Sequence, residues 1–153
     1  MTKQIPLPRG LFALVDDADY EWLNQWKWSI GSNRYAYRIN EQNRGIYMHR
    51  LITNAPNGMQ VDHINGNKLD NRRENLRVCT KHENMRNRGK QKNNTSGYKG
   101  VSWREKSKRY GAFIKIDGKY KMIGEYKTAE DAARAYNEFA KKYHGKFAKL
   151  NDL

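Results

Sequence analysis

A polar stretch divides the chain and limits the size of any core that it can build. Residues 89–97, GKQKNNTSG, contain no apolar side chain and mix Gly, Asn, Ser and Lys, which is typical of a linker. We therefore predict one domain over residues 1–88, a linker over 89–96 and a second domain over 97–153. Only 37% of the 153 residues are hydrophobic, which is low for a single well-filled core, and 10 Tyr and 4 Trp supply much of the apolar area.

The net charge points to a polyanionic partner. Thirty Lys and Arg stand against 16 Asp and Glu, a formal charge of +14. Residues 97–153 hold 14 basic and 7 acidic side chains and residues 58–96 hold 9 and 4, whereas residues 1–57 hold 7 and 5. The excess therefore lies in the centre and the C-terminal third. We expect nucleic acid as the partner, with a membrane surface as the lesser alternative.

Several classes of protein are excluded by what the sequence lacks. The single Cys79 excludes a disulfide framework and a multi-cysteine zinc site. No apolar run is long enough for a membrane span or a signal peptide, so we expect an intracellular protein. No phosphate-cradling glycine-rich loop is present, which argues against a nucleotide-driven enzyme or another small-molecule cofactor.

The N-terminal block, residues 11–52, is predicted to mix a short helix with strands. DADYEWLNQWKW reads as a helix that begins at Asp17 or Asp19. YAYRI and GIYMHRLI read as strands. We expect the Trp side chains of this block to pack rather than to stack on bases, because so small a domain needs large aromatic area.

The C-terminal block reads as three strands followed by one helix. GVSW, YGAFIKI and KYKMIGEY carry the strand pattern, and Asp117-Gly118 is the expected centre of a hairpin turn. TAEDAARAYNEFAKKYHG reads as a helix capped by Thr128 and ended by Gly145. We predict an α+β chain in which this helix covers one face of a three-stranded antiparallel sheet and leaves the other face open.

The central stretch VDHINGNKLDNRRENLRVCTKHENMRNR combines a hairpin with a helix. Asn65-Gly66 predicts that the strand holding Asp62 and His63 reverses soon afterwards, and alternation around Arg77 predicts the returning strand. The sequence from Thr80 to Glu83 is a capping box, so a helix is expected from about Lys81. This arrangement could bring Asp62 and His63 close to Asn84.

Such a cluster has the chemistry of a metal-assisted phosphodiesterase. A carboxylate and an amide oxygen are hard ligands suited to Mg²⁺. A neutral His, with an ordinary pKa of about 6.5, can deprotonate a water molecule. Nearby basic and amide side chains would hold the phosphates around the cleaved bond, and we assign this DNA contact to Arg72, Arg73, Arg86, Asn87 and Arg88.

These residues closely resemble the HNH endonucleases with a ββα-metal fold, as found in phage homing and nicking enzymes. The resemblance places the ββα-metal core at about residues 59–88 and implies that His63 is the general base, that Asp62 and Asn84 bind the metal, and that Asn75 braces the loop carrying His63. Asn84 stands where the family often has His, which favours Mg²⁺ or Mn²⁺ over zinc. No structural zinc is expected. His49, which recurs in such proteins, is assigned a structural or phosphate-contacting role.

The C-terminal block resembles the plant APETALA/ethylene-response-factor DNA-binding domain over nearly its whole length. The marks are the YKGV opening, IGEY, AARAYN and the closing LN. The resemblance implies that the open face of the sheet lies in the DNA major groove and presents Ser102, Arg104, Phe113, Lys115, Tyr120 and Met122. Several Arg and Trp positions of the plant proteins are replaced here, so their target sequence is not carried over. Phosphate contacts are assigned to Lys99, Lys106, Lys108, Arg109, Lys119 and Lys121.

Together the two resemblances predict a free-standing, homing-type endonuclease that acts on double-stranded DNA. One catalytic constellation per chain favours nicking by a monomer, with a weak dimer as the route to double-strand cuts. The resemblance to phage enzymes places it in the cytoplasm of an infected bacterium. Two other classes stay open: a non-catalytic, sequence-specific DNA-binding regulator with a relic HNH motif, and an RNA-binding protein, given the many Tyr residues.

Overall fold

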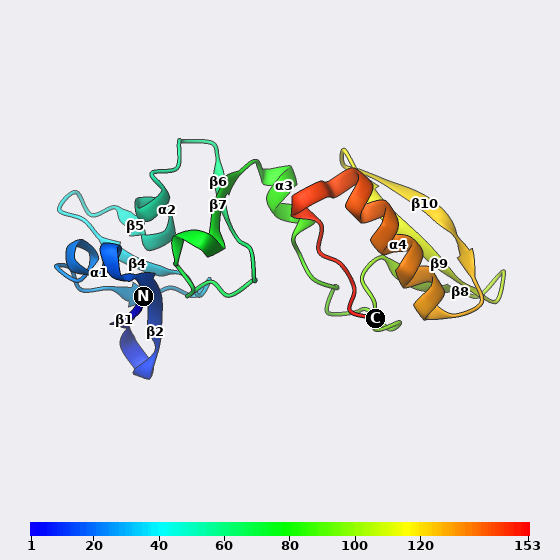
Figure 1. Ribbon diagram of the computed structural model, residues 1–153, viewed down its shortest axis with the longest axis horizontal. Coiled ribbons are helices and arrows are strands. Elements are labelled where there is room, and N and C mark those ends of the chain that lie inside the picture. Colours follow the sequence, from blue (N-terminus) through cyan, green and yellow to red (C-terminus); the bar gives the residue numbers. More distant parts are fainter. The chain divides into compact units, whose positions relative to one another are not determined.

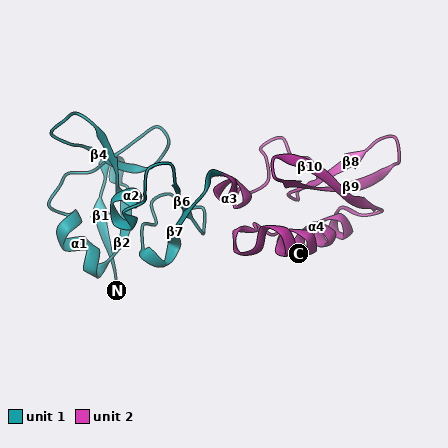
Figure 2. Cartoon of the chain, turned by 90° about the horizontal axis from the view of Figure 1, so that it is seen from above, with its two compact units in different colours: residues 1–81 teal, residues 82–153 magenta.

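The chain forms two compact units, residues 1–81 and residues 82–153 (Figure 2). The computed structural model describes all 153 residues, and both units mix short helices with small antiparallel sheets (Figure 1). The predicted α+β class is confirmed at this level. The predicted division into 1–88, a linker and 97–153 stays a prediction, because the boundary between the compact units says how contacts cluster and not where a functional domain ends.

The first unit opens with a hairpin and a helix. Strand β1 (Thr2–Pro6) pairs antiparallel with β2 (Phe12–Asp16), with a 3-10 turn at Pro8–Gly10 between them. Helix α1 (Asp17–Leu23) begins at Asp17, one of the two predicted starts, and its acidic first turn suits the positive end of the helix dipole.

A second small sheet follows, built from β3 (Ser29–Ile30), β4 (Ala36–Ile39) and β5 (Gly45–Tyr47). The tryptophans pack, as expected: Trp28 is buried, its ring stands edge-on to Trp26, and its indole N–H donates to the Leu23 carbonyl at 2.8 Å.

The strand predicted for GIYMHRLI is wrong beyond Tyr47. Residues Met48–Thr53 form helix α2, which ends at Asn54 in the left-handed conformation. The buried residues Met48, His49 and Ile52 lie one and four positions apart, the spacing of a helix face rather than of a strand. A short apolar run can fit either period, and here packing against the core decides for the helix.

The third small sheet carries the predicted site. Strand β6 (Gln60–His63) pairs antiparallel with β7 (Leu76–Cys79), and the chain between them includes a 3-10 turn at Arg73–Asn75. The two strands lie where the sequence predicted them, but the connection is a twelve-residue loop, residues 64–75, rather than a tight hairpin. One apolar cluster unites the three sheets and helices of this unit, with Trp28, Leu23, Met48, Val61 and Leu76 among its buried members.

The second unit contains a three-stranded antiparallel sheet and one long helix. Helix α3 (Lys81–Arg86) begins at the boundary between the units. The sheet has the order β10-β9-β8, from β8 (Val101–Arg104), β9 (Arg109–Ile116) and β10 (Lys119–Tyr126). Asp117 and Gly118 both have positive φ in the β9–β10 turn, as predicted for this hairpin.

Helix α4 (Ala129–His144) contacts all three strands and buries Ala132, Ala133, Tyr136 and Ala140. Its cap is the predicted one, because the Thr128 hydroxyl accepts a hydrogen bond from the Asp131 N–H at 3.1 Å. A 3-10 turn at Gly145–Phe147 follows the helix.

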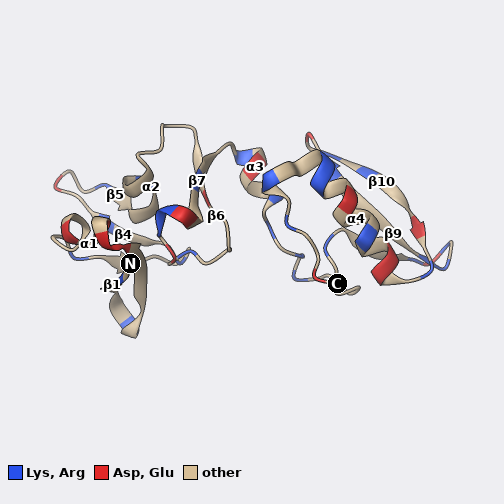
Figure 3. Cartoon of the chain, viewed as in Figure 1, with Lys and Arg blue, Asp and Glu red and all other residues tan.

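Charge and hydropathy agree with the sequence-based expectations. Figure 3 shows Lys and Arg in both units, along β10 and in the loops of the second unit, whereas α4 carries both signs. None of the helices combines the length and apolar character that a membrane crossing requires.

Candidate active site

Strand β6 places Asp62 and His63 side by side at its end. In the ladder with β7, Asp62 lies opposite Arg77 and His63 lies opposite Leu76. Val61 and Leu76 belong to the core cluster of the first unit, so this end of the ladder is held from below. Both polar residues are nevertheless buried, Asp62 at 3% and His63 at 5% exposure, and buried polar groups require partners.

The partner of Asp62 is the guanidinium of Arg77. Asp62 Oδ2 lies 2.7 Å from Arg77 Nε and 2.6 Å from its Nη2. The pair crosses the two strands directly, and the Arg77 side chain is only 16% exposed. Two desolvated charges at such distances stabilise each other strongly, and removal of one would leave the other buried without compensation. The carboxylate is thus kept ionised and fixed in direction.

His63 is bound through its Nε2 atom, which lies 2.9 Å from Asn71 Oδ1. Burial lowers the pKa of His63 below its usual 6.5, and the hydrogen bond to Asn71 and the carboxylates of Asp62 and Asp70 only partly oppose this effect. A lowered pKa keeps the imidazole neutral at pH 7, which is the protonation state that a general base requires.

Aromatic rings surround this imidazole. The ring centroid of His63 lies 5.2 Å from that of His49 and 5.7 Å from that of Tyr35. Lys68 stands with its ammonium 4.7 Å from the Tyr35 ring centroid and donates to the Asn33 carbonyl at 3.0 Å. Rings on two sides restrict the imidazole and exclude bulk water from it.

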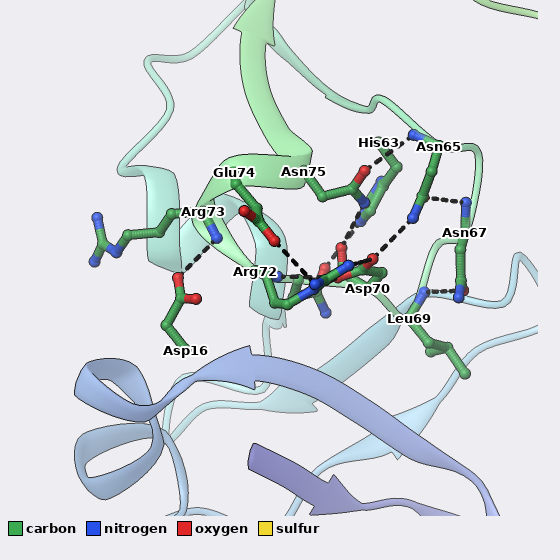
Figure 4. A network of polar contacts seen from close by, with 11 residues as sticks. Asp16, His63, Asn65, Asn67, Leu69, Asp70, Arg72, Arg73, Glu74 and Asn75 are labelled. Carbon is green, nitrogen blue, oxygen red and sulfur yellow. Dashed lines mark hydrogen bonds and ion pairs between the residues drawn. The ribbon is translucent and has the colours of Figure 1, made fainter. Parts of the chain in front are cut away.

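The loop 64–75 is held in shape by its own asparagines (Figure 4). The Asn75 side chain accepts from the Asn65 N–H at 2.9 Å and donates to the Asp70 carbonyl at 2.8 Å. Asn65 in turn donates to Asp70 Oδ2 at 2.8 Å and accepts from the Asn67 N–H at 2.8 Å. Short amide side chains that bind nearby backbone replace the ladder that a tight hairpin would have provided.

Two arginines of this loop are engaged by carboxylates. Arg72 makes a forked contact with Asp70, with Nε–Oδ1 2.7 Å and Nη2–Oδ2 2.6 Å, and a further contact with Glu74 at 2.9 Å. Arg73 makes the same kind of contact with Asp19 of α1, with both distances 2.8 Å. Such forks fix the guanidinium plane. Both side chains therefore brace the loop, and their predicted contact with DNA stays a prediction.

The backbone also ties this loop to the N-terminal hairpin. The Leu14 N–H donates to the Leu69 carbonyl and the Asn71 N–H donates to the Leu14 carbonyl, both at 2.8 Å, which makes a parallel bridge to β2. The Arg73 N–H donates to Asp16 at 2.9 Å (Figure 4). Residues from the first 20 of the chain thus hold the loop that follows His63.

The remaining predicted residues of this site lie in the second unit. Asn84 and Arg86 belong to α3, and Asn87 and Arg88 follow it. Asn84, Arg86 and Asn87 are half-buried, whereas Arg88 is exposed. The pairing of Asn84 with Asp62 around one metal ion stays a prediction. His82, in the first turn of α3, is exposed as expected.

The open face of the C-terminal sheet follows from its register. Ala112 and Ile114 of β9 are buried in the clusters that contain α4 side chains. Because side chains alternate along a strand, Phe113 and Lys115 point to the opposite face. Their partners across the ladder are Met122 and Tyr120, and Ser102 and Arg104 share this face in β8. These are the six residues that the sequence assigned to the open face.

The predicted phosphate contacts of this unit differ in exposure. Six basic residues are exposed: Lys106, Lys108, Arg109, Lys115, Lys119 and Lys121. Lys99 is not free in the same way, because its ammonium donates to the Arg86 carbonyl at 2.7 Å and burial lowers its pKa to about 8. The structure therefore gives Lys99 a role in holding the segment after α3.

His144 ends α4 and faces the sheet. It is buried, with Nε2 2.9 Å from the Lys115 carbonyl, so it ties the helix end to β9. The sequence predicted only a role at the helix terminus.

Three residues of the site were missed from the sequence: Arg77, Asp70 and Asn71. The first could have been found, because the returning strand puts Arg77 opposite Asp62 once the register is known. Nothing in the sequence separates Asn71 from the other asparagines of the loop. Its contact with His63 depends on where β2 and α2 meet the loop, which is a property of the whole unit.

His49 is expected to make folding sensitive to mild acid. It is 7% exposed, its Nδ1 has no hydrogen-bond partner, and burial lowers its pKa to about 3. In the unfolded chain the ordinary value is 6.5, so below that pH the unfolded state binds more protons than the folded state. Stability is then complete above about pH 6.5 and falls with pH, by at most about 1.4 kcal/mol per unit.

Urea unfolding at pH 7 and pH 5 measures this effect. A His49→Phe variant keeps a ring of similar size without the titrating group, and its free energy of unfolding should change less between the two pH values. Equal pH dependence in the variant and the parent chain would show that His49 is not the group responsible.

The comparisons with known proteins agree with this geometry. The sequence model of a family described as HNH endonuclease matches residues 47–86, which span β5 to α3 and include Asp62, His63 and the whole loop. A protein of Acanthamoeba polyphaga mimivirus named as an HNH endonuclease is 31% identical over 149 residues, covering 95% of this chain and 77% of its own length. Protein 3.8 of Escherichia phage T7 is 34% identical over 95 residues, covering 62% of this chain and 78% of its own length.

No solved structure matches the chain. The mimivirus relative nevertheless extends over both units, and the family match falls on the strand, loop and strand that carry the buried imidazole. The chain belongs to the HNH endonuclease family and is a nuclease.

Proposed function

We propose that the chain is a metal-dependent, homing-type DNA endonuclease that nicks one strand, with His63 as its general base. One observation carries the assignment: a buried, neutral imidazole at the end of β6 lies beside an ionised carboxylate, in a loop that its own side chains hold rigid. Family membership supports DNA as the substrate. It also favours catalysis over the non-catalytic regulator and over an RNA-binding protein.

His63 would take a proton from a water molecule. The water oxygen forms a bond to phosphorus while the bond from phosphorus to the 3′ oxygen breaks, which leaves a 5′-phosphate and a 3′-hydroxyl. General-base catalysis by a positioned side chain typically supplies about 10²–10⁴-fold in rate. Asn75 contributes indirectly, because its two side-chain hydrogen bonds hold the backbone that follows His63.

The donor chemistry fits a hard divalent cation. No group of three or more His, Cys, Asp or Glu side chains that could bind a metal occurs in the chain, which speaks against a zinc-type cage. Asp62 would hold the ion through its carboxylate, oriented by Arg77, and Asn84 would add an amide oxygen. Mg²⁺ or Mn²⁺ suits such oxygen ligands and would stabilise charge on the phosphate and the leaving oxygen.

A cleavage assay on supercoiled DNA tests this function. The purified chain is incubated with phage and plasmid DNA in Mg²⁺, in Mn²⁺ or in EDTA. Open-circular product only with metal supports a nicking nuclease, whereas linear product at the earliest times indicates coupled double-strand cuts. A gel shift on the same DNA without any product in any metal would contradict the proposal.

The open face of the C-terminal sheet is proposed as the second DNA contact. It presents Ser102, Arg104, Lys115 and Tyr120 from three strands, and Lys115 stands 5.4 Å from the centre of the Tyr120 ring. A flat, basic and partly aromatic sheet face can hold phosphates and contact bases in a groove.

The Lys115→Gln variant is expected to bind DNA more weakly and with a smaller dependence on salt. Loss of one phosphate contact should lower the slope of log affinity against log salt by about one. Lys141→Gln is the matched control, since Lys141 lies exposed on α4 and pairs with Glu138 at 3.2 Å. Fluorescence anisotropy at four salt concentrations measures both slopes. The same slope for the two variants would remove the sheet face from the DNA contact.

A further inference from the structure

The hydrogen bond between Asn71 and His63 has a defined direction. Asn71 is fully buried, its Oδ1 lies 2.9 Å from His63 Nε2, and its Nδ2 lies 3.3 Å from the sulfur of Met48. A thioether sulfur can accept a hydrogen bond but cannot donate one. The NH₂ group of Asn71 must therefore face Met48, and its carbonyl oxygen must face the imidazole.

This direction fixes the tautomer of His63. An amide oxygen only accepts, so His63 Nε2 must carry the hydrogen and donate it. In a neutral imidazole with a hydrogen on Nε2, the lone pair lies on Nδ1. The opposite amide orientation would set two acceptors against each other at Met48, and nothing else in the contact would offset that cost.

Three elements hold the Asn71 amide in place. Its backbone N–H donates to the Leu14 carbonyl of β2 at 2.8 Å, the sulfur of Met48 at the start of α2 faces its NH₂ group, and the neighbouring Asp70 is fixed by Arg72. The side chain therefore has one position, and it cannot turn to follow a rotating imidazole.

We propose that Asn71 is a positioning residue that holds His63 as the Nε2–H tautomer, so that Nδ1 is the atom that takes the proton from water. The inference rests on the proposed function of His63 as general base, and it adds which nitrogen acts and what selects it. During cleavage the proton from water binds Nδ1, and the imidazolium keeps its Nε2–H on Asn71. Asn71 itself touches neither water nor DNA.

The test compares three variants of Asn71. Leu has a similar volume and no acceptor, Asp keeps an acceptor oxygen at the same distance along the side chain, and Asn67→Ala removes an amide from the same loop that binds the Leu69 N–H and not His63. The first readout is the ¹⁵N and ¹H spectrum of the His63 ring at pH 7 without metal. The second is kcat and KM for DNA cleavage.

In the parent chain and in Asn67→Ala we expect a protonated, slowly exchanging Nε2 and an unprotonated Nδ1. In Asn71→Leu the slowly exchanging proton should disappear, and kcat should fall about 10- to 100-fold with KM unchanged. Asn71→Asp should restore the Nε2 proton and part of kcat.

A protonated Nδ1 in the parent chain, or an unchanged ring spectrum in Asn71→Leu, would overturn the inference. A fall in kcat shared equally by Asn71→Leu, Asn71→Asp and Asn67→Ala would also do so, because it would show a general loss of loop structure. The ring spectrum needs no cleavage, so it decides the tautomer even if the proposed nuclease chemistry fails in the DNA assay.

Discussion

Replacing His63 with alanine is expected to abolish cleavage of supercoiled DNA and to leave DNA binding intact. The imidazole would remove the proton from the attacking water, and loss of a general base typically costs about 10²–10⁴-fold in rate. The basic side chains proposed to hold phosphates, on the C-terminal sheet among others, are unchanged in this variant, so the affinity for DNA should stay within about twofold. Initial rates of nicking and a gel shift on the same plasmid measure the two quantities.

His82→Ala is the matched control, because it makes the same change at an exposed imidazole. His63 is buried in contact with Tyr35 and His49, so a folding defect has to be separated from a chemical one. His63→Asn fills more of the space, and near-ultraviolet circular dichroism reports whether the aromatic packing survives. Full activity in a folded His63→Ala chain would refute the general base.

The substitution Gly100→Ala is expected to destabilise the second unit strongly. Gly100 has φ +76°, and a Cβ there would lie 2.3 Å and 2.4 Å from two ring carbons of Tyr136 and 2.7 Å from the Phe113 carbonyl oxygen. Tyr136 is buried in the core beside Ile114, so its ring has no room to move. Left-handed backbone strain of about 1–2 kcal/mol adds to overpacking of about 1–3 kcal/mol. The expected loss is several kcal/mol, a large part of the stability of a small domain.

Gly118→Ala separates the two causes. Gly118 has nearly the same φ, +79°, but a Cβ there would meet nothing within 4 Å. It should therefore cost only the backbone strain. Urea unfolding followed by circular dichroism compares the two variants, and equal losses would show that the contact with Tyr136 does not limit this unit. Gly100→Ala should also weaken DNA binding through the sheet face.

The sequence predicted local structure well wherever a short-range pattern was sufficient. The capped helix after Thr128, the Asp117-Gly118 turn and the alternation in β9 each depend on side chains within a few residues of one another. The same holds for the strand that ends in Asp62 and His63. It failed at residues 48–53, where a run of six residues fits both periods and burial of Met48 and Ile52 selects the helix.

The candidate site was predicted in its strands but not in its supports. Family resemblance singled out Asp62, His63 and Asn75, yet the direct partners of the first two are Arg77 and Asn71. Arginines 72 and 73 looked like phosphate contacts because charge alone says nothing of a carboxylate that arrives from α1 or from the same loop. Contacts of this kind depend on tertiary packing, which single residues in sequence do not encode locally.

The anchoring of the loop to the first 20 residues bears on how a smaller nuclease could be cut from this chain. The family match begins at residue 47, and a fragment started there would keep the imidazole, the carboxylate and every asparagine of the loop. It would lose Leu14, Asp16 and Asp19, and with them two backbone hydrogen bonds and the forked contact to Arg73. Truncation, domain grafting or fusion should therefore keep residue 1 onward, since the motif is only part of the smallest piece that can hold its own geometry.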